Sequence, residues 1–336
     1  MRALVVAPDG GVEVVDLPDP HAQADGVVVA VHSCGICGSD VHGVEEGWAR
    51  PGQVLGHELS GTVVEVGRDV RAWAPGQAVA VDPLGGCGRC GPCRQELPFL
   101  FRALPNLGLS APGGFAELVA VPAAQLHALP EAADPELGAH AEPLAVALHA
   151  VDQAAPGPGD DALVFGVGPI GLRVVMALRA AGAGTIVAVG RSPGRRAAAA
   201  AVGADVVLDA RETSVEKFAA RSGLAFPRVY ECSGAPDAIA LCAPALAVRG
   251  TIVEVALPRS PAAVDTRLFV GRNLRLVGSC AFGPRQYRRA VELLGSGAVD
   301  MGPLVTERVS LAGAPDALRR LRQPGDLVGV LVQPWR

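Results

Sequence analysis

Three residues with metal-ligand chemistry, Cys37, His57 and Glu58, lie within a short span of this sequence. Zinc prefers thiolate, imidazole and carboxylate ligands, and a catalytic zinc uses few enough of them to leave a position for water or substrate. A closed structural site made of four cysteines would not match this set. The three residues therefore predict a catalytic zinc site.

The segments around these residues resemble a known family. Residues 56–67 match G-H-E-x-x-G-x-V-x-x-x-G without a gap, and Cys37 lies in the segment C-G-I-C-G-S-D-V-H. Together they resemble the zinc-dependent medium-chain alcohol and polyol dehydrogenases. A buried cysteine and a core histidine could meet by coincidence, but a nucleotide fingerprint further along the chain favours the metal site.

The resemblance implies roles for the neighbouring residues. Ser39 and His42 occupy the positions that the family uses to relay a proton from the zinc-bound oxygen to water. Asp40 matches the family carboxylate that orients the ligand His57. Glu58 is expected near the zinc or bound to it. The zinc is expected to act as a Lewis acid that lowers the pKa of a bound alcohol before hydride transfer.

A further glutamate, Glu142, lies in the segment A-E-P-L-A-V. It matches an E-P-L segment of the polyol-dehydrogenase branch, in which the glutamate lies beside the zinc as a ligand or hydrogen-bonded to the zinc water. His140 matches no family ligand and is expected to be packed or at the surface. The resemblance thus implies Glu142 as a fourth contact of the catalytic zinc.

Residues 166–171 fit the nucleotide fingerprint G-x-G-x-x-G, between a strand-like segment and a helical one. The first two glycines allow a tight turn and close approach of the backbone to a pyrophosphate, and the third allows close packing of helix on strand. The pattern predicts a dinucleotide site that includes these residues: Gly166, Gly168, Pro169, Ile170 and Gly171.

The end of the next strand indicates which nicotinamide cofactor is used. An NAD enzyme usually carries Asp or Glu there, whereas this chain has Gly190, Arg191 and Ser192. Without a carboxylate there is less repulsion toward a 2′-phosphate, which Arg191 can bind through its planar guanidinium. We therefore expect NADP(H) rather than NAD(H), with Arg196 also in the site. Arg195 and Arg196 could instead form the solvated face of the next helix, as we expect for at least one.

The spacing Cys87-x2-Cys90-x2-Cys93 resembles the structural-zinc lobe of the same family, but Phe101 stands where the fourth cysteine should be. Three thiolates do not complete a tetrahedral site. Reduced cysteines without metal and zinc with a weak outside ligand are both open, and we expect the metal-free form. The other cysteines are expected to be structural and buried: Cys34, Cys232, Cys242 and Cys280.

Length and composition limit the function classes. With 336 residues, 50% hydrophobic and 19% charged, the chain suits two domains. A net charge of −5 argues against a nucleic-acid surface. There is no apolar run of transmembrane length and no signal peptide, so we expect a soluble cytoplasmic protein without a membrane partner.

The pattern of strands and helices changes along the chain. Up to about residue 130 it predicts short Val-rich strands, among them 3–6, 26–31, 61–66 and 77–81; beyond about 145 strands alternate with helices, as in a doubly wound parallel sheet. The resemblance implies an α/β protein with a GroES-like β-rich catalytic zinc domain (1–145 and 285–336) and a Rossmann domain (146–284). It also implies an active site between the domains, and a homodimer or homotetramer.

We therefore expect an oxidoreductase that interconverts a secondary alcohol, polyol-like or amino-alcohol-like, and its ketone. One alternative is a zinc-independent quinone or enoyl reductase of the same fold, but such enzymes lack the set Cys37, His57 and Glu58. The other is a non-catalytic nucleotide-binding structural or regulatory protein, which has no need of Ser39 and His42.

Overall fold

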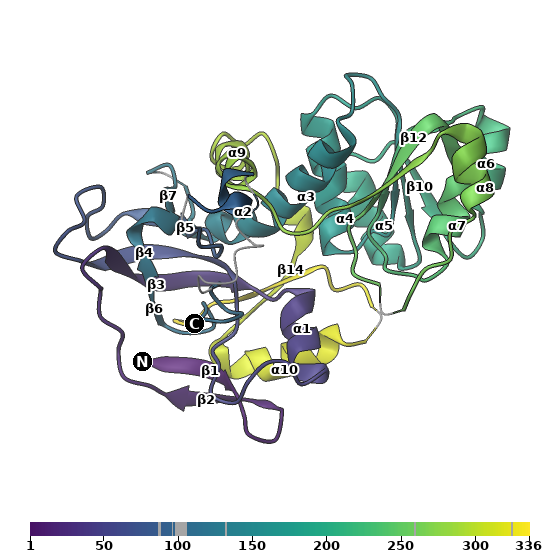
Figure 1. Ribbon diagram of the computed structural model, residues 1–336. Coiled ribbons are helices and arrows are strands. Elements are labelled where there is room, and N and C mark those ends of the chain that lie inside the picture. Colours follow the sequence, from purple (N-terminus) through teal and green to yellow (C-terminus); the bar gives the residue numbers. More distant parts are fainter. Residues whose placement is uncertain (87–88, 96, 98–105, 132, 259, 324) are drawn as a thin grey trace. The chain divides into compact units, whose positions relative to one another are not determined.

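The chain forms two compact units, each built around its own sheet. The computed structural model describes residues 1–86, 89–95, 97, 106–131, 133–258, 260–323 and 325–336 (Figure 1). The first unit comprises Met1–Glu142, Phe282–Met301 and Val305–Arg336, and the second comprises Pro143–Ala281 and Gly302–Leu304. The predicted α/β class, with a β-rich domain and a Rossmann domain, is confirmed.

The first unit is built on antiparallel strands around a Val- and Leu-rich core. Its described residues form one large sheet and the separate pair β1 (Arg2–Val6) and β2 (Val12–Asp16). The large sheet runs in the order β14 (Val305–Val309), β15 (Gly329–Val332), β3 (Gly26–Gly35), β4 (Glu58–Val66), β5 (Ala78–Val81) and β7 (Leu126–Ala128), with β6 (Leu118–Pro122) also on β3. The helices of this unit are α1 (Gly38–Glu45), α2 (Gly91–Arg94), α9 (Pro284–Gly295) and α10 (Ala314–Leu321).

The strand β3 is longer than the predicted 26–31, because its pairing with β4 continues to its end. Gly35 lies opposite Glu58 in this antiparallel register. The chain then passes through Cys37, which is the N-cap residue of α1. The first predicted metal ligand, Cys37, thus lies shortly after the end of β3, and the last, Glu58, is the first residue of β4.

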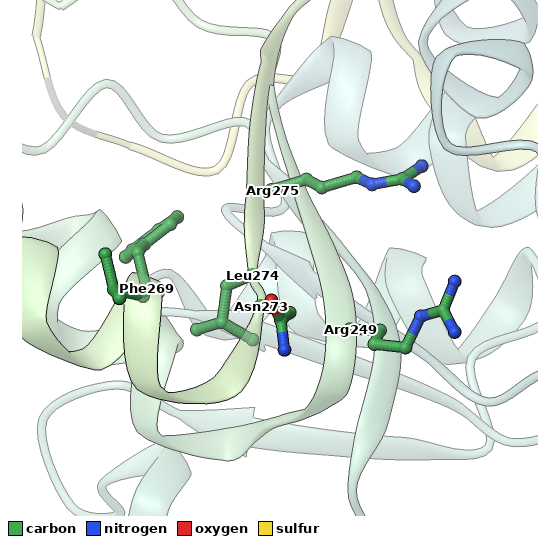
Figure 2. Close-up of a pocket in the computed structure, with 6 residues that line it drawn as sticks. Arg249, Phe269, Asn273, Leu274 and Arg275 are labelled. Atoms are coloured by element: carbon green, nitrogen blue, oxygen red, sulfur yellow. The ribbon is translucent and has the colours of Figure 1, made fainter.

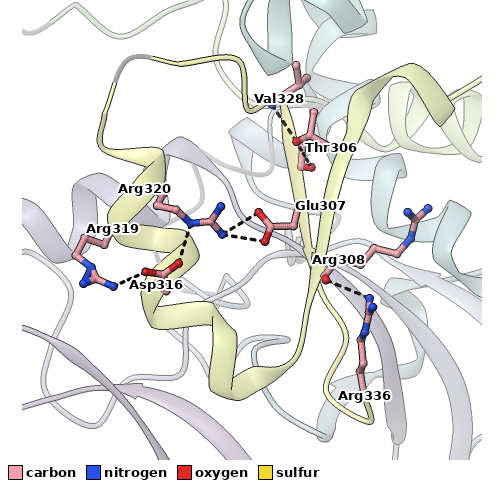
Figure 3. Close-up of polar contacts among 9 residues, drawn as sticks. Thr306, Glu307, Arg308, Asp316, Arg319, Arg320, Val328 and Arg336 are labelled. Carbon is pink, nitrogen blue, oxygen red and sulfur yellow. Dashed lines mark hydrogen bonds and ion pairs between the residues drawn. The ribbon is translucent and has the colours of Figure 1, made fainter. Parts of the chain in front are cut away.

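The C-terminal segment joins this sheet. β15 pairs with the end of β3, where Leu331 lies opposite Gly35, and β14 lies parallel to β15. Figure 3 shows the polar contacts that fix the segment, among them Arg320 of α10 with both carboxylate oxygens of Glu307 at 2.8 and 2.9 Å. The Thr306 hydroxyl donates to the Gly329 carbonyl at 2.9 Å. The last strand therefore supports the β3 end next to the ligand-bearing loop.

The second unit contains a fully parallel sheet within its described residues. The strand order is β10 (Val206–Asp209), β9 (Ile186–Gly190), β8 (Ala162–Phe165), β11 (Phe226–Glu231), β12 (Leu246–Glu254) and β13 (Arg275–Gly278). The helices between and before the strands are α3 (Ala141–Ala154), α4 (Pro169–Ala180), α5 (Pro193–Ala201), α6 (Val215–Ser222), α7 (Ala238–Cys242) and α8 (Thr266–Arg272). β8 and β9 are continuous buried apolar runs, as is typical of strands covered on both faces.

The cysteine prediction is partly wrong. Cys34 and Cys242 are buried, and Cys232 is half-buried, but Cys280 is exposed. It follows β13, the terminal strand of the parallel sheet, with only Ser279 between them, so no neighbouring strand covers it. No helix in the described part of the chain combines the length and the apolar character that crossing a membrane requires.

Two glutamates end adjacent strands of the parallel sheet. Glu231 of β11 is fully buried and lies opposite Glu254 of β12 in register. Glu231 accepts hydrogen bonds from the backbone N–H groups of Ser233 and Gly234. Burial, and then the charge of Glu231 and a hydrogen bond with it, raise the pKa of Glu254 from 4.5 to about 7. Glu254 therefore holds a proton below neutral pH.

The variant Glu254→Gln should change the pH dependence of stability. The folded state binds this proton more tightly than the unfolded state, so the wild-type protein loses stability as pH rises from about 4.5 to about 7. Measured as Tm, the variant should be close to the wild type at about pH 5 and more stable at about pH 8. The exposed Glu216→Gln is the matched control. Equal Tm differences at both pH values for Glu254→Gln would contradict the assignment.

Candidate active site and cofactor loop

The structure brings the three predicted zinc ligands together. One ligand atom each of Cys37, His57 and Glu58 lies within 4.8 Å of the other two, and His57 and Glu58 are buried. A thiol, an imidazole and a carboxylate at this separation form a donor set that suits zinc. Because the group has three protein members, it leaves room for a further ligand.

The buried carboxylate of Asp40 fastens the two ligand-bearing segments to each other. Its Oδ2 accepts a hydrogen bond from the backbone N–H of Cys37 at 2.9 Å, and its Oδ1 accepts one from Gly56 at 3.2 Å. Oδ1 also lies 3.6 Å from Nδ1 of His57. That nitrogen is buried and has no hydrogen-bond partner among the described residues. Asp40 is therefore placed to orient the imidazole when its other nitrogen binds a metal.

Burial and neighbouring charges have opposite effects on the pKa values of His57 and Cys37. Burial alone would lower the pKa of His57, but the charges of Asp40 and Cys37 outweigh it and raise this pKa well above its ordinary value. Burial raises the pKa of the Cys37 thiol, and the nearby His57 offsets part of that increase. Zinc needs the thiolate and the neutral imidazole, so its binding would displace protons from both.

Ser39 and His42 lie on one helix, three residues apart. The Ser39 hydroxyl is 3.4 Å from Nε2 of His57, next to the ligand group. The His42 side chain is 43% exposed, and its Nδ1 lies 3.6 Å from Glu46 and 3.8 Å from Glu45. Because residues three apart share a helix face, α1 leads from the half-buried Ser39 toward an imidazole at the surface.

Glu142 does not belong to the group of mutually close ligand atoms. It is buried in the first turn of α3. Together with burial and Asp82, its charge raises the pKa of the buried Tyr287. The structure therefore places Glu142 near Tyr287 within the first unit, and its predicted contact with zinc stays a prediction. His140, expected to be either packed or at the surface, is buried.

The second metal lobe is described only in part. Cys87 and Phe101 lie outside the described residues. Cys90 and Cys93 are half-buried, the first as N-cap residue of α2 and the second within that helix. The metal content of the lobe thus stays a prediction.

The outer glycines of the fingerprint are required by packing. Gly166 follows β8 with a φ of 104°, and a Cβ there would lie 2.6 Å from the backbone nitrogen of Ser233. A Cβ on Gly171 would lie 1.8 Å from the carbonyl oxygen of Gly166. Both positions therefore exclude a side chain, as the tight turn and close helix packing of a dinucleotide loop demand.

The middle glycine has open space around it instead. At Gly168, the nearest atom to a Cβ would be Nη1 of Arg195, at 4.0 Å. Gly168 is the N-cap residue of α4, which begins at the exposed Pro169 and the half-buried Ile170. The backbone at the start of α4 can therefore be approached by a phosphate group.

Packing at the end of β9 explains why Gly190 stands where an NAD enzyme usually carries Asp or Glu. A Cβ on Gly190 would lie 2.1 Å from Cγ2 of Val167, so the fingerprint loop itself excludes Asp or Glu at this position. Ser192 caps α5 by accepting a hydrogen bond from the backbone N–H of Arg195 at 3.2 Å. Ser192, one of the predicted cofactor-binding residues, thus stabilises the start of α5 in addition to any contact with the cofactor.

The predicted cofactor residue Arg196 forms an ion pair with Asp209, at the end of β10. Arg211 binds the same carboxylate, and this contact, followed by the pairing with Arg196, lowers the pKa of Asp209 well below its ordinary range. Nothing in the sequence pattern singles out Asp209 and Arg211. The available signal is the spacing D-x-R at the end of β10, the strand that pairs with β9.

Comparisons with known proteins identify the family to which both parts of the chain are similar. The family model for an alcohol dehydrogenase GroES-like domain matches residues 23–131, and the model for a zinc-binding dehydrogenase matches residues 169–296. The chain is similar to the L-threonine 3-dehydrogenase of Bacillus velezensis, with 33% identity covering 93% of this chain and 92% of that one. It is also similar to the L-idonate 5-dehydrogenase (NAD(P)(+)) of Escherichia coli K12, with 31% identity and 88% coverage of both.

A solved structure extends the similarity to three dimensions. A zinc-binding dehydrogenase from Sinorhizobium meliloti 1021, bound to NADP, matches with a TM-score of 0.90 and 33% identity over 99% of each chain.

The variant Gly35→Ala should disturb the ligand group without disrupting the sheet. A Cβ on Gly35 would lie 2.2 Å from Oε2 of Glu58, so the carboxylate must move away. We expect zinc to bind roughly tenfold or more weakly, measured by competition with a chromogenic chelator. The control is Gly38→Ala, where a Cβ meets no atom within 4 Å. Unchanged zinc affinity in Gly35→Ala would show that the Glu58 position does not matter for the metal.

Proposed function

The chain belongs to the zinc-dependent medium-chain dehydrogenase family, and we propose that it interconverts a secondary alcohol and its ketone by hydride transfer with NADP(H). Its relatives are dehydrogenases that act on CH–OH groups. The observation that carries the proposal is the convergence of Cys37, His57 and Glu58. A zinc-independent quinone or enoyl reductase would not need this group.

The first unit would hold the metal and handle the proton. Cys37 and His57, with Glu58 beside or bound to the ion, would hold zinc, which when bound supplies a Lewis acid. The Ser39 hydroxyl would accept the substrate proton at its oxygen while giving up its own proton, and His42 would accept a proton further out and release one to water. These residues also argue against a non-catalytic nucleotide-binding protein, since such a protein needs no proton path.

The substrate class is proposed from the names of the relatives. Threonine and idonate carry a secondary hydroxyl beside an amino or a hydroxyl group, which fits an amino-alcohol-like or polyol-like substrate. The buried Glu142 supports the polyol branch through its E-P-L segment.

The second unit would bind the cofactor. We propose the boundaries 1–145 and 285–336 for the zinc domain and 146–284 for the cofactor domain. Two observations support NADP(H): Gly190 excludes a carboxylate, and the similar Sinorhizobium meliloti protein is bound to NADP. The idonate relative is named for both cofactors, so the preference needs measurement. A cytoplasmic location stays a prediction.

Zinc per chain, by elemental analysis of protein purified without chelator, is the decisive measurement. We expect about one zinc per chain in the wild type. In Cys37→Ser both the zinc and ketone reduction should be lost, because only two of the three donors would remain. About two would mean that the lobe of Cys87, Cys90 and Cys93 finds another ligand. Close to zero with reduction activity retained would overturn the zinc mechanism in favour of the reductase.

We also propose a homo-oligomer, dimer or tetramer, assembled through β13. This strand ends the parallel sheet formed by the described residues, and Leu276 on it is 42% exposed. Val270 of α8 is 78% exposed and borders an open hollow of about 680 Å³, which Arg249 and Arg275 also line (Figure 2). An unpaired edge with apolar residues favours pairing with a second copy.

The variant Leu276→Arg should separate this assembly into single chains. A charge at the edge strand would have to be buried against its own copy if two edges pair. Light scattering after size exclusion would show a halved or quartered mass. Val64→Arg, at a 46% exposed position of the first unit, is the control. An unchanged mass for Leu276→Arg would place the interface elsewhere.

A further inference from the structure

Arg211 lies next to the backbone that follows β9, although it belongs to the loop after β10. Its Nη2 donates to the carbonyl oxygen of Arg191 at 2.9 Å. The same group is held by Asp209, with Nε 3.1 Å from Oδ1 and Nη2 2.9 Å from Oδ2. The guanidinium is therefore fixed beside the first residue after Gly190, where the sequence places recognition of the adenosine ribose.

Part of this guanidinium remains available to a ligand. An arginine has five N–H donors, and the contacts of Arg211 use Nε and Nη2. Nη1 donates to no described residue, and the side chain is 60% exposed. Two N–H groups on a rigidly held plane can thus bind phosphate oxygens, the geometry that arginine serves best.

Arg196 is placed differently. Its Nη1 pairs with Asp209, and its side chain is only 22% exposed. Arg191, by contrast, is exposed. Arg196 therefore neutralises Asp209 from the protein side, whereas Arg191 and Arg211 face solvent.

The sign of the local charge suits a phosphate monoester. Arg191, Arg196 and Arg211 contribute three positive charges, and Asp209 and the neighbouring Glu212 contribute two negative charges, so the local charge is positive. A phosphate monoester carries roughly 1.5 to 2 negative charges near neutral pH. The ribose of NAD(H) offers only hydroxyls here, so the surplus charge has no counterpart in that cofactor.

Resting on the proposed use of NADP(H), we propose that Arg211, held in place by Asp209, contacts the 2′-phosphate of the cofactor and sets the preference for NADP(H). Arg196, expected from the sequence to contact the cofactor, instead balances the charge of Asp209. Arg191 supplies the second solvent-facing guanidinium of the same site.

The test compares the binding of NADPH and NADH to Arg211→Ala, through the fluorescence of the reduced nicotinamide. Loss of a charge-assisted contact should raise the Kd for NADPH roughly ten- to a hundredfold. The Kd for NADH should change less than about twofold, since it carries no 2′-phosphate, and this also shows that the variant is folded. Arg211→Lys should recover only part of the loss, because it keeps the charge without the fork.

Arg267→Ala is the matched control. Arg267 also binds an aspartate two residues before it, with Nε 3.3 Å from Oδ1 of Asp265, but it lies on α8. Its NADPH and NADH affinities should stay those of the wild type. A similar loss of NADPH binding in Arg267→Ala would show that general positive charge, and not the position of Arg211, determines the preference.

The possible failures are distinguishable. If the wild type binds NADH more tightly than NADPH, the proposed cofactor preference fails, and the role of Arg211 fails with it. If the wild type prefers NADPH and Arg211→Ala keeps the same ratio of the two Kd values, the contact is overturned while the proposed function stands.

Discussion

The first unit depends on one buried carboxylate. Asp40 is fully buried, and a charge in that position is costly unless it is hydrogen-bonded or paired. Its partners come from two separate segments, the N–H of Cys37 and the N–H of Gly56, with the His57 ring behind them. The carboxylate is therefore satisfied only when both segments are in place, so Asp40 couples the position of Cys37 to that of Gly56 and His57.

In both units a glycine lies against a neighbouring side chain that leaves no space for a Cβ. Glu58 lies against Gly35, where a side chain would displace its carboxylate. In the second unit, Gly190 lies against Val167 in the same way, and this contact removes the acidic residue that an NAD site would carry. Gly35 thus allows the Glu58 carboxylate to occupy the metal site, and Gly190 keeps a carboxylate out of the cofactor site.

Residues whose roles depend on neighbours along the chain could be predicted from the sequence. The fingerprint Gly166–Gly171 requires only a strand, a turn and a helix in succession, and the strands of each unit follow from Val-rich runs. Asp209 and Arg211 could not be predicted, because their partners Arg191 and Arg196 reach them only through the pairing of β9 with β10. The exposure of Cys280 likewise depends on β13 being the terminal strand.

Composition by itself says little about the arginines. The chain has a net charge of −5, and Lys217 is its only lysine, so almost any positive charge on it is an arginine. What distinguishes Arg211 is its fixed position, because Asp209 and the Arg191 carbonyl hold three of its donors and leave Nη1 facing outward. A guanidinium that is already ordered loses less entropy when a phosphate binds than a freely rotating side chain does. The carboxylate that binds Arg211 thus favours an anionic ligand by holding the arginine in place, although its own charge is negative.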